Sequence, residues 1–157
     1  MIICNILGHL QPRIRSLTAY LKSVGVEKIT LLGFCWGGWV GTHLLANEED
    51  AKNYTCLAIG HPSVHLEEYA FGKSIQDLFD RAQKPILMLP TIGDPDGYRE
   101  NGSYYQSIKS RFPTSDTVDF PDVNHGFIVR GDLADPVIKE AVEKALDLIM
   151  RFINAHQ

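Results

Sequence analysis

Short apolar runs recur along the chain, and stretches with helical patterning separate them. KITLLGF (28–34), CLAIG (56–60) and PILMLP (85–90) have the length and composition of buried strands, and DTVDF (116–120) predicts a fourth strand. Strands that alternate with helices form a parallel sheet with helices on both of its faces. Because ligands of such sheets bind at the carboxyl ends of the strands, this alternation also predicts where a functional site will lie.

A first helix is predicted to begin with Pro12 in its first turn and to stop at Gly25, because proline suits a helix start and glycine suits a helix end. The apolar residues that repeat along it at helical spacing are Ile14, Leu17, Leu21 and Val24. We therefore expect this helix to precede the first strand.

Four further helices are predicted. They cover 36–49, where three glycines weaken the helix propensity, then 74–83, which follows a candidate serine cap, and 103–112. The last helix opens at Asp135-Pro136. The apolar face of this last helix consists of Ile138, Ala141, Val142, Ala145, Leu148, Ile149 and Phe152.

Size and composition favour one globular domain over residues 1–157. The chain has 157 residues, of which 45% are hydrophobic and 22% are charged, and this suits a single buried core. The net charge is −4 and the basic residues are scattered, so we expect no nucleic-acid partner and no membrane partner. The apolar start lacks the basic region of a signal peptide, and we expect a cytoplasmic location.

The chain contains three cysteines, Cys4, Cys35 and Cys56. An odd number at irregular spacing does not form a disulfide framework, and free thiols suit a reducing compartment. No pair of cysteines and no cluster of histidine and cysteine has the sequence spacing of zinc ligands, so no metal is expected. Cys56 opens an apolar run and is interpreted as a buried apolar side chain, an interpretation that Cys4 also allows.

GFCWG (33–37) fits the nucleophile-elbow pattern, in which the nucleophile lies between a strand and a helix. The backbone of such a nucleophile is strained, so the residues two positions away must be small, and Gly33 and Gly37 meet this requirement. The helix N-terminus would lower the pKa of the Cys35 thiol, and the backbone N–H of Trp36 would stabilise an oxyanion. The alternative is a structural cysteine at a glycine-rich helix start.

A cysteine nucleophile needs a base, and the base needs an acid that orients it. His125 follows the fourth predicted strand in VNHGF, and the loop that carries it is expected to return to the elbow. Asp94 and Asp96 both follow the third strand in GDPDG, and either carboxylate could orient the imidazole. The other aspartate would then be a turn residue.

GFCWGG, GHPS (60–63) and HGFIVRGD (125–132) together resemble the dienelactone hydrolase family, above all its eukaryotic carboxymethylenebutenolidase-like branch. The similarity runs from about residue 13 to the C-terminus. It implies an α/β-hydrolase fold and the hydrolysis of esters or enol-lactones through a thioester acyl-enzyme, with no cofactor. Its small-molecule substrate would be an ester or a lactone.

The resemblance also implies roles for individual residues. The family uses a Cys-His-Asp triad, which corresponds here to Cys35, His125 and Asp94, with Asp96 as the alternative acid. The family's arginine after the histidine contacts a substrate carboxylate, and Arg130 lies within one residue of that position.

Substrate preference is the least constrained part of the resemblance. Trp36, His61 and Arg130 favour an aromatic or anionic acyl group, and His61 and Arg130 are the expected substrate-binding residues.

Family members carry a further N-terminal segment of several strands, which supplies a second oxyanion N–H and part of the pocket, and residues 1–12 do not resemble it. The elbow strand would then form an edge of the sheet, and an exposed edge favours self-association. MIICNIL (1–7) is a candidate to pair with this edge. The alternative to a hydrolase is therefore a catalytically impaired remnant that binds a partner or a second copy of itself. A third interpretation is a redox-sensing thiol at Cys35.

Overall fold

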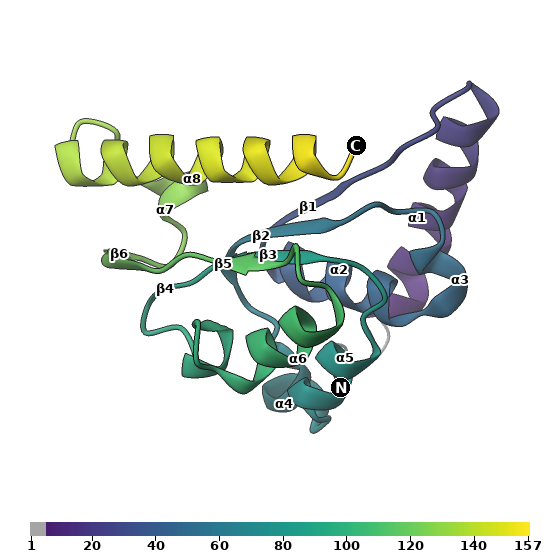
Figure 1. The fold of residues 1–157 in the computed structure, drawn as a ribbon, viewed down its shortest axis with the longest axis horizontal. Helices are drawn as coiled ribbons and strands as arrows, with labels where there is room; N and C mark the ends of the chain where they lie inside the picture. The colour runs from purple at the N-terminus through teal and green to yellow at the C-terminus, as the bar shows by residue number, and fades with distance from the viewer. Residues whose placement is uncertain (1–5) are drawn as a thin grey trace.

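The computed structural model describes residues 6–157, and within them a four-stranded parallel sheet has the strand order β1-β2-β3-β5 (Figure 1). These strands are β1 (Leu31–Cys35), β2 (Leu57–Pro62), β3 (Ile86–Leu89) and β5 (Asp116–Thr117). A second parallel sheet pairs β4 (Thr91–Ile92) with β6 (Phe120–Asn124). The parallel sheet that the alternating sequence pattern predicts is confirmed.

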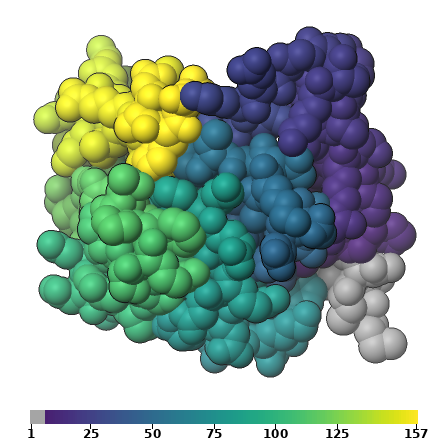
Figure 2. All heavy atoms as spheres, turned by 45° about the vertical axis from the view of Figure 1, so that its right-hand side comes forward, coloured from purple at the N-terminus to yellow at the C-terminus, as the bar shows by residue number. Residues whose placement is uncertain are grey.

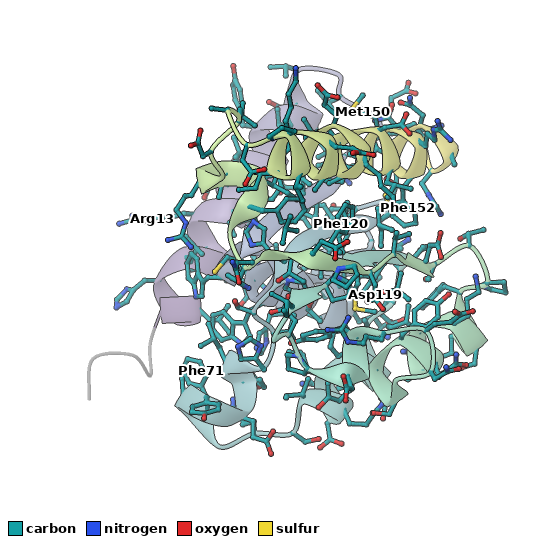
Figure 3. The ribbon with its side chains drawn as sticks, turned by 90° about the vertical axis from the view of Figure 1, so that its left-hand side faces the viewer. Arg13, Phe71, Asp119, Phe120, Met150 and Phe152 are labelled. Carbon is teal, nitrogen blue, oxygen red and sulfur yellow. The ribbon has the colours of Figure 1, made fainter. Side chains whose placement is uncertain are left out.

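Helices cover both faces of the main sheet. α8 (Pro136–Ala155) lies on one face, and three helices lie on the other (Figure 1). The three are α2 (Trp36–Ala46), α5 (Ile75–Arg81) and α6 (Ser103–Arg111). Phe120 and Phe152 are buried between α8 and the sheet, whereas Met150 lies on the outer side of the helix (Figure 3). Helices on both faces were predicted, and this arrangement is confirmed.

Strand β2 shows why its sequence is a continuous apolar run. Leu57 and Ile59 belong to the core beneath α2, and Cys56 and Ala58 belong to the core beneath α8. A strand that is covered on both faces buries every side chain, so apolar residues do not alternate with polar ones. The interpretation of Cys56 as a buried apolar side chain is therefore confirmed.

The first helix differs from its prediction. α1 (Ile6–Ser23) begins before Pro12, which lies inside the helix rather than in its first turn. A proline within a helix has no N–H to donate to the preceding turn. Leu7 and Leu10 nevertheless pack against the core ahead of the proline, and this packing accounts for the longer helix.

The apolar repeat along α1 is only partly buried. Ile14 packs against the core, whereas Leu17, and Val24 directly after the helix, are each 58% exposed. The buried side of the helix instead carries Thr18, whose hydroxyl lies 3.0 Å from the Tyr54 hydroxyl. Helical spacing alone therefore identified the helix and misplaced part of its buried face.

Two other predicted elements are divided in the structure. The helix predicted over 36–49 breaks at Asn47, whose side chain accepts a hydrogen bond from the Asp50 N–H at 3.1 Å and caps α3 (Glu48–Ala51). The strand predicted over 116–120 divides into β5 and β6, which belong to different sheets.

Three short helical elements were not predicted. They are α4 (Leu66–Phe71), the 3₁₀ helix η2 (Asp96–Tyr98) and α7 (Phe127–Arg130). The helices predicted over 74–83 and 103–112 and the last helix are present, with the Asp135 carboxylate accepting from the Val137 N–H at 2.9 Å.

β1 lies at one edge of the main sheet as far as residues 6–157 define it. Most of MIICNIL (1–7), the candidate partner for this edge, lies outside the described residues, and its last two residues begin α1. Across the same described part of the chain, no helix has both the length and the hydropathy needed to span a membrane.

Candidate active site

Cys35 stands at a sharp turn between β1 and α2. It is the last residue of the strand, and its backbone has φ 54° and ψ −119°, which few residues other than glycine adopt. A Cβ added at Gly33 would lie 2.5 Å from the Gly37 carbonyl carbon, so no larger residue fits there without moving the backbone. The backbone of this turn therefore places the Cys35 thiol beside the first turn of α2.

The steric requirement that was predicted for Gly37, the second glycine of the elbow pattern, is not seen in the structure. A Cβ at Gly37 would meet no described atom within 4 Å, so the turn does not require a glycine there. The close approach is instead at Gly38 and Gly41, where a Cβ would lie 2.3 Å from Ile59 and 2.6 Å from Leu57. These two glycines let α2 pack directly on β2.

The two candidate acids have opposite environments. Asp94 is buried, and its Oδ2 accepts hydrogen bonds from the Thr91 backbone N–H and hydroxyl, both at 2.8 Å. Its Oδ1 lies 3.1 Å from His125 Nδ1. The side chain of Asp96 is fully exposed and pairs with Arg99. Of these two aspartates, Asp94 is the one that lies within hydrogen-bonding distance of His125.

β4 and β6 explain how Asp94 meets His125. The two strands pair in parallel, with Ile92 opposite Asn124, so the loops that follow them emerge side by side. Parallel strands end at the same edge of a sheet, and here that edge presents a carboxylate from one loop to an imidazole from the other.

A buried serine stands between the thiol and the imidazole. Ser63 Oγ lies 3.3 Å from Cys35 Sγ and 3.3 Å from His125 Nε2. Ser63 follows β2, and its backbone N–H donates to the Cys35 carbonyl at 3.2 Å. Contacts therefore run from Cys35 through Ser63 and His125 to Asp94.

The contacts of Cys35 and His125 lower the pKa of the thiol and raise the pKa of the imidazole. Burial would raise the pKa of the Cys35 thiol, but hydrogen bonds from Ser63, His125 and the Trp36 backbone outweigh burial and hold that pKa below 9.0. Burial would lower the pKa of His125, but contacts with Cys35 and Asp94 outweigh burial and hold that pKa above 6.5. Opposite shifts of this kind favour a thiolate beside an imidazolium.

His61 lies beside this pair but is completely buried at the end of β2. Its ring centroid is 4.8 Å from that of His125, in an edge-on arrangement. Burial, with repulsion from His125, lowers the pKa of His61 to about 4. His61 is therefore neutral near pH 7, and it presents no exposed surface to a substrate in this arrangement.

Trp36 and Arg130 border the same region. The Trp36 backbone N–H opens α2 beside the thiol, and its indole stacks on Trp39 with the ring centroids 6.2 Å apart. Arg130 ends α7 and lines a surface hollow together with His125. Its guanidinium lies so close to Gly126 that a Cβ there would come within 2.6 Å of Nη2.

Cys35, His61 and His125 also form a cluster of metal-binding side chains. One ligand atom from each lies within 4.8 Å of those of the other two. The sequence spacing of these residues gave no hint of a metal site, because Cys35 and His61 lie near the ends of β1 and β2 and His125 directly follows β6.

Sequence reasoning missed Ser63 and Thr91. Ser63 is part of GHPS, so its position directly after a buried strand was an available signal. Thr91 opens the short strand β4 and was visible only as part of a turn-rich loop.

The family model described as "Dienelactone hydrolase family" matches residues 5–157. No curated protein and no solved structure matches the chain significantly.

Proposed function

Because the chain belongs to the dienelactone hydrolase family, an α/β-hydrolase family, we propose that it cleaves carboxylic esters or enol-lactones with Cys35 as the nucleophile. His125 acts as base and acid, and Asp94 orients it. The observation that carries the proposal is the series of contacts from the strained Cys35 turn through Ser63 and His125 to the buried Asp94.

The first half of the reaction transfers the acyl group to sulfur. The Cys35 thiolate attacks the carbonyl carbon and forms a C–S bond, and the Trp36 N–H at the start of α2 donates to the developing oxyanion. The C–O bond then breaks, and the alkoxide leaving group takes a proton from the His125 imidazolium. In a lactone this alkoxide stays attached to the acyl chain.

The second half returns the enzyme to its starting state. Neutral His125 takes a proton from water, which attacks the thioester carbonyl. The C–S bond breaks, and the acid leaves with Cys35 again as thiolate and His125 as imidazolium. Asp94 holds Nδ1 of His125 throughout, so that Nε2 faces the reacting atoms.

The proposal also covers the residues that contact the substrate and the location of the protein in the cell. Arg130 lines the hollow next to His125 and would pair with a substrate carboxylate, while the Trp36 indole would contact an aromatic acyl group. A cytoplasmic location suits the two described cysteines, Cys35 and Cys56, which are both free thiols.

The test is hydrolysis of p-nitrophenyl acetate and of a dienelactone by the wild type, Cys35→Ala and Cys56→Ala, each checked for folding by circular dichroism. We expect Cys35→Ala to abolish turnover and Cys56→Ala to retain it, since Cys56 is buried in the core. Mass spectrometry of the quenched wild type should show the acyl group on Cys35. Equal turnover by the wild type and Cys35→Ala would contradict the proposal.

A second candidate function is self-association through the β1 edge. Within the described residues one side of β1 has no strand partner, and Leu32 in this strand is 48% exposed. Leu17 and Tyr20 on α1, with Val24 directly after it, add an exposed apolar stripe, and α1 lies on the flank opposite α8 (Figure 2). An unpaired strand beside apolar surface is a template for a second copy of the same strand.

Sedimentation velocity over a range of protein concentrations tests this second candidate. Leu32→Lys should lower the average mass, while the control Met150→Lys, which changes an exposed apolar residue on α8, should not. A mass that stays monomeric at all concentrations, or that falls equally in both variants, would exclude association through this edge.

A further inference from the structure

His61 has an unusual environment for a histidine. It has no exposed surface, and neither ring nitrogen has a hydrogen-bond partner among residues 6–157. Leaving a buried polar group without a partner costs about 1–3 kcal/mol, and buried polar groups in folded proteins are rarely left so. The proposed hydrolase chemistry uses Cys35, His125 and Asp94 and gives His61 no proton to carry.

The surroundings of His61 hold its ring in place. Its backbone has φ 39°, and its ring lies within contact range of the rings of Phe34 and Phe127, with centroids 5.9 and 6.1 Å away. The ring is therefore fixed against Cys35 and His125 by packing rather than by hydrogen bonds.

We propose that Cys35, His61 and His125 form a three-ligand site for Zn²⁺, and that occupation of this site switches off the Cys35 nucleophile. A thiolate and two imidazoles are ligands that zinc prefers, and three protein ligands leave a fourth position for water. Occupation would also give one nitrogen of His61 the partner that it lacks.

The distances are close to those that zinc requires. The three ligand atoms lie within 4.8 Å of one another. Tetrahedral zinc with ordinary bond lengths places such atoms about 3.3–3.6 Å apart, so small side-chain rotations bring them to the ion. Cys35 and His125 are partly exposed and give the ion a path to the buried His61.

Asp94 and the burial of His61 favour the forms of the two imidazoles that bind a metal. Asp94 Oδ1 binds Nδ1 of His125 and leaves Nε2 free for the metal, which is the carboxylate–histidine–metal arrangement common in zinc proteins. His61 is completely buried, and burial favours the neutral form of the ring, which is the form that binds a metal. When the ion binds the thiolate and His125, the proton on Nε2 passes to solvent.

Zinc binding would block the reaction because the metal and the proposed reaction use the same two atoms. Cys35 Sγ, once bound to zinc, no longer attacks a carbonyl, and His125 Nε2, once bound, no longer transfers a proton. Zinc binding itself does not depend on the proposed hydrolase function; only the inhibition does. The two proposals can therefore fail separately.

The direct test is titration of the reduced, chelator-treated full chain with Co²⁺, a spectroscopic substitute for Zn²⁺. We expect one equivalent to give thiolate-to-cobalt absorption in the near ultraviolet and the strong visible bands of four-coordinate cobalt, and Zn²⁺ to displace it. Zinc X-ray absorption of the wild type should then report one sulfur and two imidazoles, a readout that needs no variant.

Variants separate this site from chance binding. His61→Phe keeps the ring volume and should weaken Zn²⁺ binding by at least about 10–100-fold, the loss that follows even when an outer partner of a ligand is removed. His156→Gln is the matched control, because His156 lies at the end of α8 and pairs with Thr114. It should bind zinc like the wild type.

The results that would overturn the proposal are equally direct. They are the absence of a cobalt–thiolate band, a zinc environment without two imidazoles, and equal zinc affinity in the wild type and a folded His61→Phe variant. Full hydrolase activity with one zinc bound to this site would overturn the inhibition.

Discussion

Two histidines meet at the carboxyl edge of the sheet with their ring centroids 4.8 Å apart, and their surroundings differ completely. His125 is partly exposed and has a partner at each nitrogen, Asp94 at Nδ1 and Ser63 at Nε2. His61 is fully buried, and within residues 6–157 it has none. The pKa of His125 is raised by its partners, and the pKa of His61 is lowered to about 4 by burial.

This difference shows how one edge can hold two imidazoles for different tasks. An imidazole that exchanges protons needs access and partners that stabilise its charged form. An imidazole that must stay neutral is better kept in an apolar pocket. Substitutions of His125 and of His61 should therefore have different effects on turnover, stability and pH dependence.

The largest difference is expected in turnover. His125→Gln removes the proposed base and acid and should lower kcat/KM by about 10⁴-fold. His61→Phe removes no proton carrier and no hydrogen bond and keeps the ring volume, so it should lower kcat/KM by roughly tenfold or less. Steady-state hydrolysis of an activated ester in zinc-free buffer measures both. Equal losses in two folded variants would remove the distinction between the histidines.

Replacing Asp94, whose carboxylate contacts Nδ1 of His125, should give the next largest loss of turnover. Asp94→Asn leaves the shape intact but removes the charge that holds Nδ1, and the loss should stay below the about 10⁴-fold loss known for serine triads, because a thiolate needs less activation. Asp96→Asn is the matched control on the same loop, and its exposed side chain predicts no change. Rate constants for the two variants decide between the carboxylates, and a greater loss for Asp96→Asn would reverse the assignment.

The sequence predicts the elbow side of this site better than the histidine side. Cys35 was predictable because the strand, the turn and the helix are consecutive in the chain, and Gly33 marks a contact between residues four apart. Asp94 and His125 meet only because β4 pairs with β6, and neither strand is long or apolar enough to show a clear pattern. The choice of Asp94 over Asp96 came from the family resemblance, not from the local residues.

The burial of His61 could not be predicted from the neighbouring residues in the sequence, for a similar reason. Its burial depends on Phe34 and Phe127, which come from segments far apart in the chain. Single-sequence patterns report which residues are apolar and how they repeat. They do not report which polar side chain the packed segments will enclose.

The stability of the protein should depend on pH through His61. Its folded-state pKa of about 4 lies below the ordinary 6.5, so the unfolded chain binds more protons in this window, and stability rises with pH. This contribution is complete above pH 6.5 and is lost as pH falls toward 4, with a size of roughly 3 kcal/mol.

Urea unfolding at pH 7 and at pH 4.5 measures this contribution. The wild type should lose more unfolding free energy between the two pH values than His61→Phe, whose apolar ring takes up no proton. His156→Gln should behave like the wild type. A loss of the same size in His61→Phe would show that other groups cause the acid sensitivity.

The smallest expected effect is a shift in the pH–rate profile. The proposed reaction needs the Cys35 thiolate and the His125 imidazolium, so kcat/KM should rise through the thiol pKa, below 9.0, and fall through the imidazole pKa, above 6.5. Asp94 raises the pKa of His125, so Asp94→Asn should move the alkaline limb to lower pH. His61→Phe removes only a neutral neighbour in this range and should leave the limb in place. A limb that moves in His61→Phe and not in Asp94→Asn would mean that the buried imidazole, rather than the carboxylate, sets the charge of the pair.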